Sequence, residues 1–263
     1  VGGLGVGSAR STAGDFASAV LEWAGYRRGR EEILKEKIGL IGHSEGGSVA
    51  SLAAQEDHFR FVVLLSGPAV KGEEIVIEQI RLISKAMGLR DEEIRKTLEE
   101  QRRVYVLLNS PGGAEELERT VKEGIRESLK TMGPEERRSV SDTEAFVNSY
   151  AALQLATLRS PWTRFFLSYD PAQAHERVKC PVLALYGALD LQVSPEQNVS
   201  PLREAFKRGG NGDVTIRVIP GGNHLFLQAK TGSPSEYPSL EKVFLPGFLE
   251  TLSDWILTRV GTP

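Results

Sequence analysis

Apolar residues in this chain gather into four short runs, each with the length and composition of a buried β-strand. The runs lie at 37–41, 61–65, 181–187 and 214–219. Between them, apolar residues recur at three- and four-residue spacing, which predicts amphipathic helices. Continuous apolar strands that alternate with helices are typical of a mostly parallel sheet with helices on both faces, so the pattern predicts an α/β fold.

The spacing of apolar residues predicts helices on either side of the strands. One helix is predicted over 15–35, where Phe16, Val20, Trp23 and Ala24 share a face, and it leads into the first strand. Two more are predicted near 197–208 and over about 246–259. A strand, a helix and a second strand at this spacing imply a right-handed crossover within one sheet.

Between the second and third strands, residues 71–159 are charged, have helical periodicity and carry almost no strand signal. Four consecutive helices are predicted there, at 73–87, 91–108, 114–131 and 143–158. Ordinary crossover helices are the alternative interpretation, but four helices without a strand favour an inserted cap over the carboxyl edge of the sheet. The predicted domains are therefore a core of residues 1–71 and 160–263 and a helical cap of residues 72–159.

The first predicted strand runs directly into Gly42-His43-Ser44-Glu45-Gly46 and then into small residues that suit a closely packed helix. A strand, a G-x-S-x-G sequence and a helix together indicate a nucleophile elbow. Such a turn strains the backbone of Ser44, and side chains in place of Gly42 or Gly46 are expected to collide with the neighbouring strand and helix. It also directs the Glu45 N–H toward a developing oxyanion. A simpler interpretation makes Ser44 a helix N-cap.

Two further residues complete a candidate catalytic triad. Asp190 follows the third predicted strand and His224 follows the fourth. The order Ser44, Asp190, His224 is the order found in α/β-hydrolases. All three lie just beyond the carboxyl end of a predicted strand, the edge where open parallel sheets collect active-site residues. His224 would act as general base, and Asp190 would orient it.

Each of these residues has a simpler interpretation or a competitor. Asp190 alone could cap a loop or helix, and His224 could pack in a turn against the C-terminal helix. Asp170 is a competing acid, but it precedes Pro171 in a turn before the third strand, at the wrong edge of the sheet. Asp213 begins the last strand, also at the wrong end. His43, inside the elbow, is expected to support packing rather than act as base.

Composition excludes several classes of protein. The net charge of −3 over 263 residues gives no electrostatic basis for binding nucleic acid or an anionic membrane. No apolar run approaches the ~18 residues of a membrane span. The single cysteine, Cys180, rules out an internal disulfide framework, and its place at a strand entrance favours a structural role. The histidines, His43, His58, His175 and His224, lack zinc-ligand spacing, so neither a metal nor another cofactor is expected. A cytoplasmic location is favoured, and the oligomeric state stays open.

Several blocks resemble a group of bacterial α/β-hydrolase carboxylesterases, the EstD-like esterases. The resemblance rests on GHSEGG at 42–47, LLSGPAVKGEE at 64–74, SPWTRFFLSYDPA at 160–172, VKCPVLALYGALDLQV at 178–193 and PGGNHLFLQAKTGSPSEY at 220–237. It implies an α/β-hydrolase fold with Ser44 as nucleophile, Asp190 as acid and His224 as base. It also implies that the Glu45 backbone N–H is one oxyanion donor.

The start of the chain departs from this family pattern. Gly5-Val6-Gly7-Ser8 resembles the RGVGxS loop of the family, and the strands before that loop are then expected upstream of Val1. The second oxyanion donor normally comes from a loop after the third strand of the fold, and it is unknown here. The glycine-rich segment 2–7 could offer backbone N–H groups, or another loop could substitute.

The sequence therefore predicts a serine carboxylesterase that hydrolyses small carboxylic esters with short-to-medium acyl groups through an acyl-enzyme on Ser44. An acyl-CoA thioesterase or a serine aminopeptidase would use the same triad and remains an alternative. A non-enzymatic binding protein on a hydrolase scaffold is a third, although all three triad members are present. The expected partner is a small-molecule ester.

Overall fold

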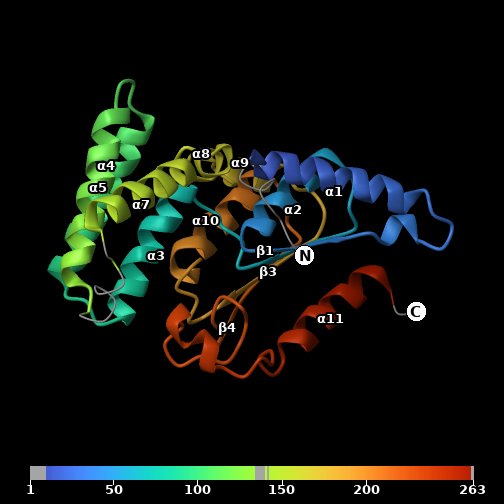
Figure 1. The fold of residues 1–263 in the computed structure, drawn as a ribbon. Helices are drawn as coiled ribbons and strands as arrows, with labels where there is room; N and C mark the ends of the chain where they lie inside the picture. The colour runs from blue at the N-terminus through green and yellow to red at the C-terminus, as the bar shows by residue number, and fades with distance from the viewer. Residues whose placement is uncertain (1–9, 134–139, 141, 262–263) are drawn as a thin grey trace.

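The central element is a parallel sheet, as predicted. The computed structural model describes residues 10–133, 140 and 142–261. Within these residues, the sheet has four parallel strands in the order β1-β2-β3-β4, where β1 is Leu40–His43, β2 Val62–Leu65, β3 Val182–Gly187 and β4 Val214–Ile219. Figure 1 shows the strands running side by side through the right-hand part of the molecule. The carboxyl ends of the strands thus meet at one edge.

The first strand begins later than its apolar run suggested. Lys35–Lys37 forms the short 3-10 helix η2, and β1 starts only at Leu40, so the predicted strand 37–41 is wrong at both ends. The Lys37 N–H donates to the Leu34 carbonyl at 2.9 Å, which closes a tight turn before the strand. Gly39 then passes so close to Phe61 that a Cβ would lie 2.3 Å from the ring. That contact explains the glycine in an otherwise branched run.

Helices cover both faces of the sheet (Figure 1). α1 (Ala13–Arg28), α2 (Glu45–Glu56) and α10 (Pro195–Arg208) pack on one face, and α11 (Phe248–Val260) packs on the other. α10 and α11 lie within a few residues of their predicted bounds. β2 and β3 bury apolar side chains on both faces, which explains why these two strands read as continuous apolar runs.

α1 differs from its prediction in length and in the face that it buries. It ends at Arg28, where the Gly29 N–H donates to the carbonyls of Gly25 and Tyr26, so the predicted range 15–35 is too long. Its buried residues are the alanines 13, 17 and 24, which let α1 approach α2 closely. Trp23 is 60% exposed, because the alanine face rather than the largest side chain meets the core.

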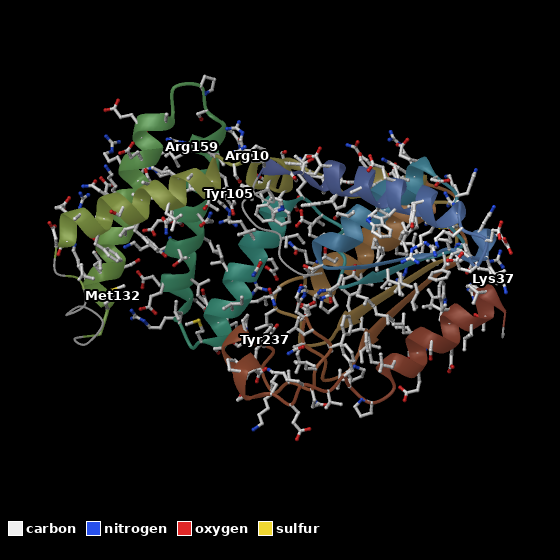
Figure 2. The ribbon with its side chains drawn as sticks, turned by 45° about the vertical axis from the view of Figure 1, so that its right-hand side comes forward. Arg10, Lys37, Tyr105, Met132, Arg159 and Tyr237 are labelled. Carbon is white, nitrogen blue, oxygen red and sulfur yellow. The ribbon has the colours of Figure 1, made fainter. Side chains whose placement is uncertain are left out.

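Between β2 and β3, the described residues form a helical block. It contains α3 (Gly72–Ala86), α4 (Asp91–Asn109), α5 (Ala114–Thr131) and α7 (Thr143–Leu158), close to the four predicted ranges. α8 (Pro161–Ser168) and α9 (Ala172–Arg177) follow and were not predicted. The block encloses its own hydrophobic cluster, which includes Tyr105 and Leu117, and it lies at one end of the molecule (Figures 1 and 2). None of the described helices is both long and apolar enough to cross a bilayer.

Candidate active site

Ser44 lies at the junction of β1 and α2 in an unusual backbone conformation. Its φ is 56° and its ψ is −126°, and a non-glycine residue rarely adopts such a positive φ. The turn is held by the Ser44 N–H, which donates to the Leu65 carbonyl at 2.8 Å, and by the Gly47 N–H, which donates to the Ser44 carbonyl at 2.8 Å. This is the strained strand-to-helix turn expected of a nucleophile elbow.

The two flanking glycines of the elbow differ in what they contribute. A Cβ at Gly42 would lie 2.0 Å from the Gly46 carbonyl oxygen, so no side chain fits there. A Cβ at Gly46 would meet no atom within 4 Å, so the predicted collision at this position is wrong. The second close approach involves Gly47 instead, where a Cβ would lie 2.9 Å from the Gly67 Cα. The turn therefore requires glycine at 42 and 47, where backbone passes backbone.

Asp190 and His224 lie together at the carboxyl edge of the sheet. The His224 Nδ1 is 2.9 Å from the Asp190 Oδ2, and the two side chains are 6% and 0% exposed. The other oxygen, Asp190 Oδ1, accepts the backbone N–H groups of Gln192 at 2.8 Å and Val193 at 2.9 Å. Three donors thus orient the Asp190 carboxylate. Because His224 uses its Nδ1 for this contact, its Nε2 is available for another partner.

The competing acids are engaged elsewhere. The Asp170 Oδ1 accepts the Ala172 N–H at 3.0 Å at the start of α9. Asp213 pairs with Arg259 at 2.8 Å, at the beginning of β4 and away from its carboxyl end. Each fills a local structural role, while Asp190 alone of the three is hydrogen-bonded to His224.

Glu45 begins α2 directly after Ser44. Among the described residues, the structure records no acceptor for its backbone N–H, which lies at the helix N-terminus. The Glu45 side chain turns toward α8, where its Oε1 accepts the Trp162 indole N–H at 2.8 Å. Partial burial raises the pKa of the Glu45 carboxyl, and the Trp162 hydrogen bond counteracts part of that rise. The first turn of α2 therefore offers a donor to the elbow and an acceptor to the helical block.

Comparison with known proteins places the chain in a family. The family model described as serine aminopeptidase, S33, matches residues 7–230. The chain belongs to this α/β-hydrolase family. A search of curated protein sequences returned no match.

Solved structures similar to this α/β-hydrolase share little sequence with it. An esterase from Thermogutta terrifontis is 16% identical, with a TM-score of 0.44, and the match covers 96% of this chain and 74% of that one. A monoacylglycerol lipase from Paleococcus ferrophilus is 18% identical, with a TM-score of 0.43 and coverages of 95% and 77%. A proline iminopeptidase from Mycobacterium smegmatis is 12% identical, with a TM-score of 0.47 and coverages of 96% and 75%.

The segment proposed for the missing oxyanion donor lies outside the described residues. This applies to the glycine-rich stretch 2–7 and to the RGVGxS-like sequence at 5–8. The second donor therefore stays unassigned, and the strands expected upstream of Val1 stay a prediction. The described part of this α/β-hydrolase supplies the strained serine, the acid–histidine pair and one backbone donor.

Three polar residues around His224 were not predicted as parts of the site from the sequence: Asn223, Tyr237 and Gln192. The Asn223 Oδ1 accepts the N–H groups of Leu225 at 2.9 Å and Leu227 at 3.0 Å, which shapes the turn. Tyr237, in the short 3-10 helix η3 (Pro234–Ser239), accepts the Gln192 side-chain N–H at 3.0 Å. Glycines at 221 and 222 had marked a turn, but nothing in the sequence alone indicated which polar side chains would hold it.

The other histidines and the cysteine of this α/β-hydrolase have different environments. His175 is fully buried: its Nε2 lies 3.1 Å from the Pro68 carbonyl, and its Nδ1 lies 2.9 Å from the Ser51 hydroxyl. Burial lowers the pKa of His175 to about 4. Burial also raises the pKa of the Cys180 thiol to about 11, so this cysteine is a neutral packing residue. No group of three or more His, Cys, Asp or Glu side chains in the described ranges could hold a metal ion.

Two hollows lie between the helical block and the rest of the molecule. A narrow crevice beside Glu45 is lined by Ser48 and by apolar side chains that include Pro68, Val70, Phe165 and Phe166. A larger groove of about 720 Å³ runs along α3 and α4 to Gln197 of α10, past Glu73 and Tyr105. Both hollows have walls from the helical block.

Proposed function

We propose that the protein is a serine carboxylesterase that hydrolyses short-to-medium acyl esters through an acyl-enzyme on Ser44. The observation that carries the proposal is the buried 2.9 Å contact between His224 Nδ1 and Asp190 Oδ2, at the same sheet edge as the strained Ser44. A buried carboxylate that accepts from Nδ1 leaves the imidazole Nε2 as the basic atom.

The reaction assigns one task to each group. As the Ser44 Oγ attacks the ester carbonyl carbon, His224 Nε2 takes the hydroxyl proton and Asp190 stabilises the imidazolium. The oxyanion is bound by the Glu45 N–H and a second donor that is not identified. Collapse breaks the bond to the alcohol oxygen, which leaves with the proton from His224. Water, deprotonated by the same nitrogen, then attacks the acyl-enzyme and releases the acid and Ser44.

An apolar crevice beside Glu45, the residue after Ser44, supports an ester with an apolar acyl group. Residues 72–159 would act as a cap. The crevice, with Val70, Phe165 and Phe166 in its wall, has a volume of only about 10 Å³, so it would have to widen to receive the acyl chain. The resemblance of GHSEGG and PGGNHLFLQAKTGSPSEY to EstD-like esterases supports the same substrate class. No residue of the proposed reaction requires a cofactor.

Ser44→Ala tests the assignment on a series of p-nitrophenyl acetate, butyrate and octanoate. The expected loss of turnover is about 10⁴-fold or more, because the nucleophile is removed. Ser18→Ala, on the exposed face of α1, is the matched control and should match the wild-type rate. Intact-mass analysis after fluorophosphonate treatment should show one adduct, lost in Ser44→Ala. Equal turnover of Ser44→Ala and wild type sinks the proposal.

A serine aminopeptidase is the second candidate, because the family model carries that description. The Glu45 carboxylate beside the nucleophile could bind a substrate ammonium group. Aminoacyl p-nitroanilides, p-nitrophenyl esters and acyl-CoA thioesters tested side by side distinguish the candidates. A kcat/KM for the anilides above that for the esters would favour the peptidase, and the highest value for the thioesters would favour a thioesterase.

A further inference from the structure

The carbonyl oxygen of His224 is held by a side chain from another segment. It accepts a hydrogen bond from His43 Nε2 at 2.8 Å. His43 comes from β1, so this contact joins distant parts of the chain.

His43 is the residue before the nucleophile, which gives its contact a particular meaning. Because a carbonyl oxygen only accepts, the neutral His43 ring must carry its proton on Nε2. Partial burial keeps the neutral form favoured by lowering the pKa of His43. The His43 and His224 rings also pack together, with centroids 4.7 Å apart. The His43 side chain therefore links the elbow to the backbone of His224 through one hydrogen bond.

Tyr237 supports the loop that carries the acid. Its hydroxyl accepts from Gln192 Nε2 at 3.0 Å, and the Gln192 backbone N–H donates to Asp190 Oδ1 at 2.8 Å. Tyr237 lies in η3, in the segment that follows the His224 turn (Figure 2). This phenol therefore joins the segment after His224 to the loop that carries Asp190.

The His224 turn needs this support because its own backbone is strained. Phe226 has a φ of 57°, which a bulky aromatic residue seldom adopts, and its ring is buried against Phe248 with centroids 4.5 Å apart. A strained turn keeps one conformation only when its surroundings over-determine it. The hydrogen bond of His43 to the His224 carbonyl and the contact of Tyr237 with the Asp190 loop supply those additional constraints.

We propose that His43 and Tyr237 are positioning residues for the general base: His43 holds the His224 carbonyl, Tyr237 holds the loop that carries Asp190, and together they fix the direction of the His224 imidazole relative to Ser44. The proposal rests on the proposed function. Neither residue binds substrate or transfers a proton, so loss of either contact lowers kcat and leaves KM within about threefold. A displacement of about 1 Å at a reacting group costs up to about 100-fold in rate.

Three variants test the two contacts. His43→Phe keeps an aromatic ring but removes the donor, and it should lower kcat by about 10- to 100-fold. His43→Gln places an amide N–H where Nε2 was, and it should recover most of the loss. Tyr237→Phe removes only the hydroxyl and should lower kcat by about 10-fold. His58→Gln and Tyr26→Phe, at exposed positions outside the site, are the matched controls and should behave as wild type.

Hydrogen exchange of the Gln192 amide, which donates to Asp190 Oδ1, gives a readout that needs no activity. Tyr237→Phe removes the acceptor of the Gln192 side chain and loosens this loop, so exchange measured by NMR should speed up by about tenfold or more, while both controls keep the wild-type rate. Unchanged exchange in Tyr237→Phe, or a His43→Phe enzyme with wild-type kcat, overturns the proposal. Failure of the esterase assignment looks different: wild type itself would then lack the Ser44 adduct, and the exchange result would still decide the contacts.

Discussion

The Nδ1 atom of His224 lies 2.9 Å from the Oδ2 atom of Asp190, and the second Asp190 oxygen is held by two backbone N–H groups. Both oxygens of this buried carboxylate are therefore committed, one to the imidazole and one to the loop at Gln192 and Val193. The carboxylate cannot rotate without losing a donor on one side. Its orientation determines which nitrogen of His224 carries the proton.

Asp190→Asn should nearly abolish turnover while the fold persists. The loop N–H groups at 192 and 193 require an oxygen, so the asparagine amide would direct its NH₂ toward His224. His224 would then place its lone pair on Nδ1 and its proton on Nε2, where it cannot accept the Ser44 proton. We expect kcat for p-nitrophenyl butyrate to fall about 10³- to 10⁴-fold, as in serine hydrolases in which the orienting acid is replaced.

The matched control for this variant is Asp213→Asn. Asp213 pairs with Arg259 at a partly exposed position at the start of β4, so its loss should change kcat by less than about twofold. A similar rate loss in both variants would mean that Asp190 acts through the fold rather than through His224. Thermal unfolding of both proteins separates these outcomes.

Gly42→Ala and Gly46→Ala should have opposite effects on stability. The alanine Cβ at 42 would overlap the Gly46 carbonyl at 2.0 Å, and since both groups are backbone, neither can move away. We expect a loss of about 3 kcal/mol or more in the free energy of unfolding. Position 46 has open space and lies in α2, so alanine there should leave the free energy unchanged or raise it by up to about 1 kcal/mol. Urea denaturation of both variants measures the contrast, and equal losses would contradict it.

These contrasts show what the sequence could predict. β3 and β4 lie within one residue of their apolar runs. β3 is buried along its whole length and carries its signal in every residue, whereas β4 is only partly buried but keeps a β-branched run. α8 was not predicted, although Ser160 is its N-cap and Pro161 lies in its first turn. The order Ser44, Asp190, His224 was readable because strand ends share one edge.

The sequence did not predict contacts between residues that lie far apart along the chain. His43 and His224 are 181 positions apart, and their hydrogen bond depends on how two loops meet after folding. The same holds for Glu45 and Trp162, which join α2 to a helix that the periodicity did not predict. Residue types and spacing identify the reacting groups, whereas the residues that orient them depend on tertiary packing.

Glu45→Gln should stabilise the protein at neutral pH. Burial raises the pKa of Glu45 above its ordinary value, so the folded protein binds this proton more tightly than the unfolded chain. The associated stability is fully present below the unfolded pKa of about 4.5 and is lost as pH rises through the folded pKa. Glutamine has no charge to bury, and its carbonyl can still accept from Trp162. The melting temperature should therefore exceed that of wild type at pH 7 and match it near pH 4.

Glu36→Gln, at an exposed position of η2, is the control and should leave the melting temperature within about 1 °C at both values. A Glu45→Gln protein that is less stable than wild type at pH 7 would show that the carboxylate's hydrogen bond outweighs the cost of burying its charge. In that case the direction of the Glu45 pKa shift would be wrong.

His175 should make the protein less stable in mild acid. Burial lowers the pKa of folded His175 to about 4, against 6.5 for a free imidazole, and the Pro68 carbonyl and Asp170 offset only part of that effect. Between these values the unfolded chain binds a proton that the folded protein excludes, so the free energy of unfolding falls as pH drops from about 6.5 to about 4. The contribution is on the order of 3 kcal/mol and is fully present above pH 6.5.

His175→Gln keeps a donor for the Pro68 carbonyl but leaves the Ser51 hydroxyl without its acceptor. The free energy of unfolding should therefore be lower than that of wild type at pH 7, and its slope between pH 4 and 6.5 should be flatter. Urea denaturation at several pH values measures both effects, with His58→Gln as the control that keeps the wild-type slope; an unchanged slope in His175→Gln would assign the acid sensitivity to other groups.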